Sequence, residues 1–206
     1  MVSQTGFRRW LAALVVCSVA VVVCVEYVDR PAAEFFERTV HHSELHLWLT
    51  HFLRPFVLVP VAALGLLFGA GCWRISGREL AAWTEIPLLC CWSIVWALAV
   101  EFAGKEICGR SWPVPTYLSG HQYGFRWLHG GPGWTSFPSG TALGAWAPAA
   151  VLWQAVPRFR VAGALLATLL CAGAVATNGH WVSDVIAGAF VGVSIGWMTV
   201  AMRRAR

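Results

Sequence analysis

Residues 182–201, VSDVIAGAFVGVSIGWMTVA, decide the fold, because they form one long apolar run in which Asp184 is the single charged residue. An α-helix of about 20 mainly apolar residues spans a bilayer. Similar runs recur along the chain at 10–25, 52–73, 86–103, 139–156 and 161–176. The sequence therefore predicts an all-α fold: a polytopic membrane protein whose six transmembrane helices form a bundle, with residues 1–206 in a single membrane domain.

The composition agrees with a membrane setting. Hydrophobic residues make up 58% of the chain and charged residues 12%, with a mean hydropathy of +0.62, whereas a soluble domain carries about 25% charged residues. The net charge of +5 does not indicate a nucleic-acid partner, because the arginines lie at the ends of apolar runs and form no basic face with interleaved aromatic residues. The seven cysteines show neither a disulfide framework nor metal-ligand spacing.

The distribution of basic residues predicts the orientation, because cytoplasmic segments retain positive charge. Nine arginines fall on the side of the two termini: Arg8, Arg9, Arg74, Arg78, Arg158, Arg160, Arg203, Arg204 and Arg206. Six basic residues fall on the other side: Arg30, Arg38, Arg54, Lys105, Arg110 and Arg126. We therefore expect a multi-pass protein of the cell inner (plasma) membrane, with both termini cytoplasmic and the long loops outside. A signal peptide also begins with basic residues before an apolar run, but no small-x-small cleavage site follows this one.

Two further patterns concern the helices. The polar and aromatic stretch 29–51 has rough helical spacing, which predicts an interfacial helix or a reclining hairpin. Small residues four positions apart permit close helix packing. Five glycines in the second and sixth runs have this spacing: Gly65 and Gly69, and Gly188, Gly192 and Gly196. We expect both sets to lie at helix contacts.

On this topology, three polar segments that are distant in the sequence reach the same outer face. They are KEICGRSWP at 105–113, FPSGT at 137–141 and GHWVSD at 179–184. Lys105 is the one lysine of the chain, and Arg110 follows five positions later, so the first segment offers two cations. A lysine at the end of a span can also be a snorkelling anchor, but two neighbouring cations favour an anion site.

The other two segments supply complementary chemistry. Pro138-Ser139-Gly140 opens a helix whose N-terminus favours an anion, because its first backbone N–H groups are free. His180 and Asp184 are four positions apart and share a helix face, so the carboxylate can orient the imidazole and leave its other nitrogen nucleophilic. Taken singly, these features are also ordinary helix caps and an interfacial histidine. Together, the three segments predict a phosphate-handling site.

The same segments resemble the type 2 phosphatidic acid phosphatase family, membrane lipid phosphatases related to vanadium haloperoxidases. The pattern of that family has three segments. The first is a lysine followed, after six residues, by Arg-Pro, and the second is Pro-Ser-Gly-His before a helix. The third is Ser-Arg followed, after five residues, by a histidine and, after three more, by an aspartate. The resemblance covers about 88–202 and implies a six-helix fold with an outward-facing site. By position, it implies that Lys105, Ser139 and Gly140 bind phosphate. It further implies that His180 forms a phosphohistidine and that Asp184 orients this nucleophile.

Three departures from the family pattern remove an arginine or a histidine: Trp112 stands in place of the first arginine, Thr141 in place of the leaving-group histidine, and Ala174 in place of the arginine of the third segment. Gly173 also stands in place of the serine of that segment. A hydroxyl group cannot act as a general acid near neutral pH. Because phosphoryl transfer depends on charge stabilisation, a site with fewer cations is expected to be slow unless other groups compensate.

Candidates for compensation lie in the loop between the third and fourth runs. Arg110 is two positions from Trp112 and can supply the missing charge, and His129 or His121 can protonate a leaving group; the alternative for either histidine is a solvated loop residue. The expected catalytic residues are His180, Asp184 and His129, and the expected phosphate ligands are Lys105, Arg110, Ser139, Gly140 and Thr141.

The sequence therefore favours a membrane lipid phosphatase or phosphotransferase that acts on a phospholipid or a polyprenyl phosphate or diphosphate at the extracytoplasmic face. The resemblance implies no cofactor and no metal; His42 and His46 resemble half of a metal site but lack thiolate partners. The alternative is a catalytically impaired phosphatase-like protein that serves as a lipid-binding or partner subunit, which the three departures support. A channel or transporter is disfavoured, because Glu101 is the one acid deep in a span.

Overall fold

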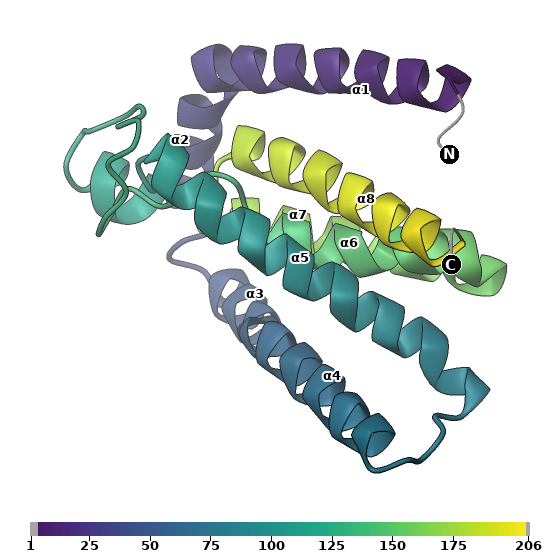
Figure 1. The fold of residues 1–206 in the computed structure, drawn as a ribbon. Coiled ribbons are helices and arrows are strands. Elements are labelled where there is room, and N and C mark those ends of the chain that lie inside the picture. Colours follow the sequence, from purple (N-terminus) through teal and green to yellow (C-terminus); the bar gives the residue numbers. More distant parts are fainter. Residues whose placement is uncertain (1–3, 205–206) are drawn as a thin grey trace.

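The computed structural model describes residues 4–204, and within this range the chain is a bundle of helices without strands (Figure 1). The helices are α1 Gln4–Val23, α2 Asp29–Thr39, α3 Glu44–Leu53, α4 Val59–Ile75, α5 Glu85–Cys108, α6 Gly140–Ala155, α7 Arg160–Ala176 and α8 Val182–Arg204. Within residues 4–204, five helical segments are long and apolar enough to cross a membrane: Gln4–Thr39, Glu44–Ile75, Ala82–Cys108, Pro157–Ala176 and Val182–Arg204. The predicted all-α polytopic fold is confirmed, and five of the six predicted spans fall within these segments.

The remaining predicted span, 139–156, is α6, which has 16 residues. At 1.5 Å per residue it is about 24 Å long, a few ångströms less than the apolar thickness of a bilayer, which is about 30 Å. It nevertheless lies at the centre of the bundle, where it packs against α5, α7 and α8. Helix α6 is therefore the scaffold on which the other elements are placed.

The stretch 29–51, predicted as an interfacial helix or hairpin, forms two short helices. A turn of π-helix at Cys24–Val28 joins α1 directly to α2. After a turn, α3 begins and continues through a 3₁₀ segment at Arg54–Leu58 into α4. Helices α2 and α3 each contact α7, so this stretch lies over the end of α7 that precedes α8.

The two predicted glycine sets differ in what they contact. On α8, a Cβ atom at Gly188 would come within 2.7 Å of the backbone oxygen of Ser139, the N-cap of α6. At Gly192 and Gly196 it would come within 2.8 and 2.3 Å of backbone oxygens of α6. The glycine stripe therefore allows α6 and α8 to approach closely, as predicted. On α4, a Cβ atom at Gly65 or Gly69 would meet nothing within 4 Å. The prediction of close packing at these two glycines is wrong, because α4 lies at the margin of the bundle and packs mainly on α5.

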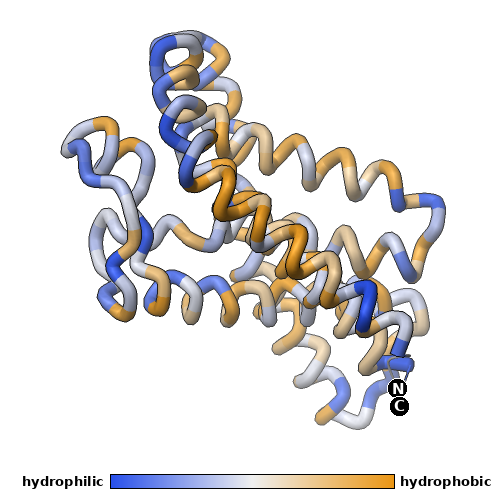
Figure 2. The backbone as a smooth tube through the Cα atoms, turned by 90° about the horizontal axis from the view of Figure 1, so that it is seen from above, coloured by the Kyte–Doolittle hydropathy of each residue, from blue (hydrophilic) through white to orange (hydrophobic). Residues whose placement is uncertain are grey.

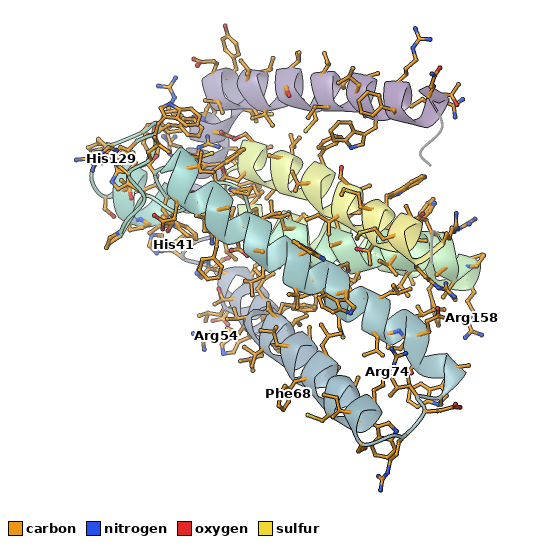
Figure 3. The ribbon with its side chains drawn as sticks, in the orientation of Figure 1. His41, Arg54, Phe68, Arg74, His129 and Arg158 are labelled. Carbon is orange, nitrogen blue, oxygen red and sulfur yellow. The ribbon has the colours of Figure 1, made fainter. Side chains whose placement is uncertain are left out.

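The outer surface of the bundle is apolar and its two ends are polar (Figure 2). Helix α1 has no buried residue, and its valines face outward, with Val16 69% exposed. This is the surface expected of helices in contact with lipid tails. The chain ends of the described part lie at one end of the bundle, together with Arg74 and Arg158, whereas His41 and His129 lie at the other end (Figures 1 and 3). The protein is thus a multi-pass membrane protein with polar loops at opposite ends.

Replacing Gly196 with alanine should destabilise the bundle, because the new Cβ atom would lie 2.3 Å from the carbonyl oxygen of Ala147. Overpacking of this kind costs about 1–3 kcal/mol of the free energy of unfolding. Gly69→Ala is the matched control, since no atom lies within 4 Å of its new methyl group; alanine is the better helix former, so this variant should be unchanged or slightly more stable. Thermal unfolding in detergent measures both, and equal melting temperatures would contradict close packing of α6 on α8.

Candidate active site

His180 lies on the short turn between α7 and α8. Asn178 adopts a left-handed conformation there, with φ of 54°, which ends α7 and reverses the chain. The amide of Asn178 donates to the backbone oxygen of Ala33 at 3.1 Å and to Glu37 Oε2 at 3.2 Å, so the turn is held against α2. The backbone N–H of His180 donates to the oxygen of Ala174 at 3.1 Å. These bonds fix the position of an imidazole that is 8% exposed.

Asp184 lies in the first turn of α8 and is fully buried. Its Oδ2 atom accepts hydrogen bonds from Ser136 Oγ at 2.5 Å and from the backbone N–H of Trp181 at 3.1 Å. The same oxygen lies 3.6 Å from Nδ1 of His180, which is too far for a hydrogen bond, and the described residues offer this nitrogen no other partner. The two side chains lie close together as predicted, but not on one helix face, because His180 precedes α8. A small shift of the imidazole would complete the bond.

Arg110 reaches the carboxylate of Asp184 from the other side. One guanidinium nitrogen lies 2.5 Å from Asp184 Oδ1 and another lies 2.5 Å from Asp29 Oδ2, and all three side chains are fully buried. Burial by itself lowers the pKa of Arg110, but the carboxylates of Asp184 and Asp29 outweigh it and raise the pKa. This arrangement differs from the expectation that Arg110 holds a phosphoryl oxygen, because its terminal nitrogens are directed to internal partners.

Asp29, Ser183 and Tyr123 complete this buried cluster, and the sequence analysis did not identify any of them. Asp29 Oδ1 accepts from the backbone N–H of Ser183 at 3.0 Å, and Oδ2 accepts from the Ser183 hydroxyl at 2.5 Å. Burial raises the pKa of Tyr123 to about 12, so its hydroxyl stays protonated and donates to the backbone oxygen of Val25 at 2.6 Å. The sequence showed only that the carboxylate of Asp29 follows shortly after the first apolar run. Its partners Arg110 and Ser183 are 81 and 154 positions away, so local patterns could not indicate the cluster.

The N-terminus of α6 lies beside this cluster. Ser139 caps the helix, with its Oγ accepting from the backbone N–H of Ala142 at 3.3 Å. Its own backbone N–H donates to the backbone oxygen of Asp184 at 3.2 Å, which ties α6 to α8. Ser139 is fully buried. Gly140 and Thr141, the next two residues, are partly exposed and line a cavity.

Lys105 comes from α5, which approaches the same helix end. A Cβ atom at Gly104 would lie 2.5 Å from the ring of Pro138, so the glycine permits this approach. Lys105 Nζ lies 2.5 Å from Glu101 Oε1, one turn earlier on α5. The carboxylate of Glu101 in turn lies over Gly140, where a Cβ atom would be within 2.4 Å of both its oxygens. Glu101 was noted in the sequence only as an acid within a span, and the structure brings it to the predicted phosphate-binding turn.

A cavity of about 410 Å³ runs along α6 from Gly140 to Leu152. Its polar lining residues are at the Gly140 end, where Glu101, Thr141 and His180 meet. The remaining walls are apolar and come from Leu53, the segment Arg54–Leu58, and helices α4, α5, α6 and α7. The cavity therefore joins a polar end, where a phosphate group can be held, to an apolar channel between helices.

His129, predicted to be catalytic, and Trp112, a departure from the family pattern, are not among the residues that line this cavity. His129 is exposed on the long loop at one end of the bundle, and its Nδ1 atom pairs with the backbone oxygen of Trp127 at 2.8 Å (Figure 3). The structure does not bring it into the lining of the cavity. Trp112, which replaces the expected arginine, lies with its ring 5.0 Å from that of His180 and 5.8 Å from Lys105 Nζ. An aromatic wall thus stands where the family pattern has a cation.

Replacing Arg110 with methionine should unfold or strongly destabilise the protein, because it leaves Asp29 and Asp184 buried without a countercharge. Removing one partner of a buried ion pair costs about 3–5 kcal/mol of the free energy of unfolding. Arg38→Met is the control, since the Arg38–Glu34 pair is largely exposed and such pairs contribute little. Unfolding in detergent compares the two variants, and similar stabilities would contradict a structural role for Arg110.

Known proteins resemble this chain in sequence family and in fold. Residues 86–206 match the PAP2 superfamily, and no curated protein matches the sequence. A crystal structure described as the first transmembrane PAP2 type phosphatidylglycerolphosphate phosphatase, from Bacillus subtilis, is similar in fold. The two share 14% sequence identity over 93% of this chain and 96% of that chain, with a TM-score of 0.51. Since the matching region covers more than half of the sequence and contains all three polar segments, the chain belongs to the PAP2 superfamily, as the resemblance implied.

Proposed function

We propose that this chain is a membrane lipid phosphatase or phosphotransferase that acts on a lipid phosphate or diphosphate at the extracytoplasmic face through a phosphohistidine intermediate. One observation carries the proposal: His180 faces Asp184 at the polar end of an apolar cavity that begins at the N-terminus of α6. Membership of the PAP2 superfamily supports it. The structural neighbour is described as a phosphatase of phosphatidylglycerolphosphate, which favours a phosphate on a lipid as the substrate class here.

Binding of the phosphate group rests on α6 and α5. The free backbone N–H groups at the start of α6, around Gly140 and Thr141, favour an anion at the helix N-terminus. Lys105 is next to this turn and adds a positive charge once its pairing with Glu101 is relaxed. Ser139 keeps the turn in place through its cap and its bond to α8. The apolar walls of the cavity accept the lipid chain, so that the phosphorus atom is held at the polar end.

Transfer of the phosphate group uses His180 as the nucleophile. Its Nε2 atom attacks phosphorus in line with the leaving oxygen, while Asp184 accepts a hydrogen bond from Nδ1–H and fixes the tautomer. The ring gains positive charge as the bond to phosphorus forms. Asp29, Asp184 and Arg110 together carry a net charge of −1, and this negative charge lies beside the ring. It stabilises the charged intermediate, which water or an acceptor lipid then resolves. In the proposed reaction, side chains and backbone N–H groups of this chain bind the phosphate, attack it and stabilise the intermediate.

Alanine at His180 should reduce phosphate release to background, because no phosphohistidine can form. Asp184→Asn should reduce the rate by about 10⁴-fold or less, through a misoriented imidazole. His51→Ala is the matched control, since His51 is exposed and bonds only within α3. The assay measures phosphate release by purified protein from phosphatidic acid, phosphatidylglycerol phosphate and polyprenyl diphosphate in mixed micelles.

Acid-labile labelling of the wild type, absent from the His180 variant, would identify the intermediate. Full activity of the His180 variant would exclude the covalent route. If the wild type releases no phosphate from any of these lipids, the alternative of a catalytically impaired lipid-binding subunit is favoured instead.

The proposed orientation is tested with single cysteines in a background that lacks the seven native ones. Leu128→Cys lies on the exposed loop beside His129, and Arg158→Cys lies in the exposed turn at the other end of the bundle. A thiol reagent that cannot cross membranes should label position 128 in intact cells and position 158 only after permeabilisation, because positive charge stays in the cytoplasm. The reverse pattern would place the site on the cytoplasmic side.

A further inference from the structure

The proposed reaction needs a proton donor for the leaving oxygen, and the residues considered so far do not provide one. Thr141 carries a hydroxyl group, which does not give up a proton near neutral pH. His129 is exposed on the loop and is not part of the cavity lining. Among the described residues that line the cavity, the ionisable side chains are those of His180 and Glu101. If His180 is the nucleophile, Glu101 is the group left to act as the acid.

The position of Glu101 fits this role. Its carboxylate lies over Gly140, the residue before Thr141, and therefore at the start of α6, where the phosphate is proposed to bind. Its side chain is 20% exposed, so the group is open to the cavity yet largely shielded from bulk solvent. Gly140 is required at this place, since any side chain there would overlap the carboxylate. The carboxylate and the imidazole of His180 thus border the same polar end of the cavity.

The charges of the site give a second reason. In the structure Glu101 forms an ion pair with Lys105 at 2.5 Å, so this corner of the cavity is neutral. A lipid phosphate brings negative charge to the same helix end, and a carboxylate beside it would repel the substrate. A protonated Glu101 removes this repulsion and releases Lys105 to bind a phosphoryl oxygen. The other charged groups that face this corner are His180, from the turn between α7 and α8, and Asp184 behind it.

We propose that Glu101 is the general acid and base of the reaction, an inference that rests on the proposed phosphatase function. In the first step the lone pair of His180 Nε2 forms the P–N bond while the P–O bond to the leaving alcohol breaks. The electron pair of that bond stays on the oxygen, which takes the proton of the Glu101 carboxyl group. Glu101 is left as a carboxylate paired with Lys105, which is the arrangement in the structure.

In the second step the carboxylate of Glu101 removes a proton from a water molecule, and the water oxygen forms a new P–O bond. The P–N bond breaks and its electron pair returns to Nε2 of His180. Inorganic phosphate leaves, and Glu101 is protonated again for the next substrate. One residue thus serves both half-reactions, which is consistent with microscopic reversibility.

The test uses two substrates with the same chain but different leaving groups: dodecyl phosphate, and a nitrophenyl phosphate that carries a dodecyl chain. An alcohol needs a proton to leave, whereas a nitrophenol does not. For Glu101→Gln, kcat/KM on dodecyl phosphate should fall by about 10²–10⁴-fold, while kcat/KM on the nitrophenyl ester should stay within a few-fold of the wild type. Because the second step also loses its base, kcat should fall on both substrates and phosphoenzyme should accumulate with the nitrophenyl ester.

The controls separate this inference from the proposed function. Glu106→Gln removes an exposed carboxylate on the same helix, outside the cavity lining, and should leave all rates unchanged. Thr141→His in the Glu101→Gln background should partly restore the rate on dodecyl phosphate, since it places a new acid beside the old one. His180→Ala should abolish turnover of both esters, and full activity of that variant would overturn the proposed function itself.

Several outcomes would overturn the role of Glu101 while leaving His180 in place. An equal loss of kcat/KM on both esters would make Glu101 a partner of Lys105 only. No loss on either ester would remove it from the reaction. A gain in activity on both would mean that its carboxylate obstructs phosphate binding. Loss of the protein to misfolding is detected by its melting temperature, and Glu101→Asp, which keeps the acid, should then show the same preference for leaving groups as the wild type.

Discussion

The ion-pair cluster of Asp29, Arg110 and Asp184 is the interaction on which the rest of the site depends. It is fully buried, and it joins α2, the loop after α5 and the first turn of α8. Burying three charges is costly unless each one is paired and hydrogen-bonded, and here the hydroxyl groups of Ser136 and Ser183 supply the additional bonds. The net charge of −1 that remains lies beside His180. The cluster therefore sets the electrostatic field around the imidazole, whose position is held by the hydrogen bonds of the turn at Asn178.

Helix packing connects this cluster to the start of α6, the proposed phosphate-binding turn. The backbone oxygen of Asp184 accepts a hydrogen bond from the backbone N–H of Ser139, and the glycine stripe of α8 lets α6 and α8 lie close together along their length. The start of α6 is consequently joined to the start of α8, beside the turn with His180, by a backbone hydrogen bond and by close helix packing. Helix α5 adds Lys105 and Glu101 to this arrangement, because Gly104 allows it to touch Pro138. The proposed nucleophile and the proposed phosphate-binding turn come from separate segments, and these contacts hold them next to each other, as phosphoryl transfer would require.

Much of the fold could be predicted from the sequence, because apolar length and periodicity are local properties. The positions of α1, α4, α5, α6, α7 and α8 follow from such runs. The nearness of His180 to Asp184 was also expected, but it arises at the turn before α8 and not from a shared helix face. The partners of Arg110 could not be predicted in this way. Two cations near a polar turn suggest an anion site, but whether an arginine faces a ligand or a buried carboxylate depends on Asp29, which lies 81 positions away. Glu101 was missed for the same reason, since only the crossing of α5 and α6 brings it to Gly140.

The structure also explains how a site with few cations can belong to this superfamily. Arg110 is directed inward, so in the proposed reaction it would act on the substrate only through Asp184 and His180. Trp112 replaces a cation with an aromatic wall beside the imidazole, and Lys105 is neutralised by Glu101 when no phosphate is bound. The polar end of the cavity therefore pairs its charges, which suits the proposed binding of a lipid chain between the apolar walls. In the proposed reaction Lys105 is released from its ion pair when the carboxyl group of Glu101 carries a proton. Binding of phosphate and delivery of a proton to the leaving group would then depend on the same carboxyl group.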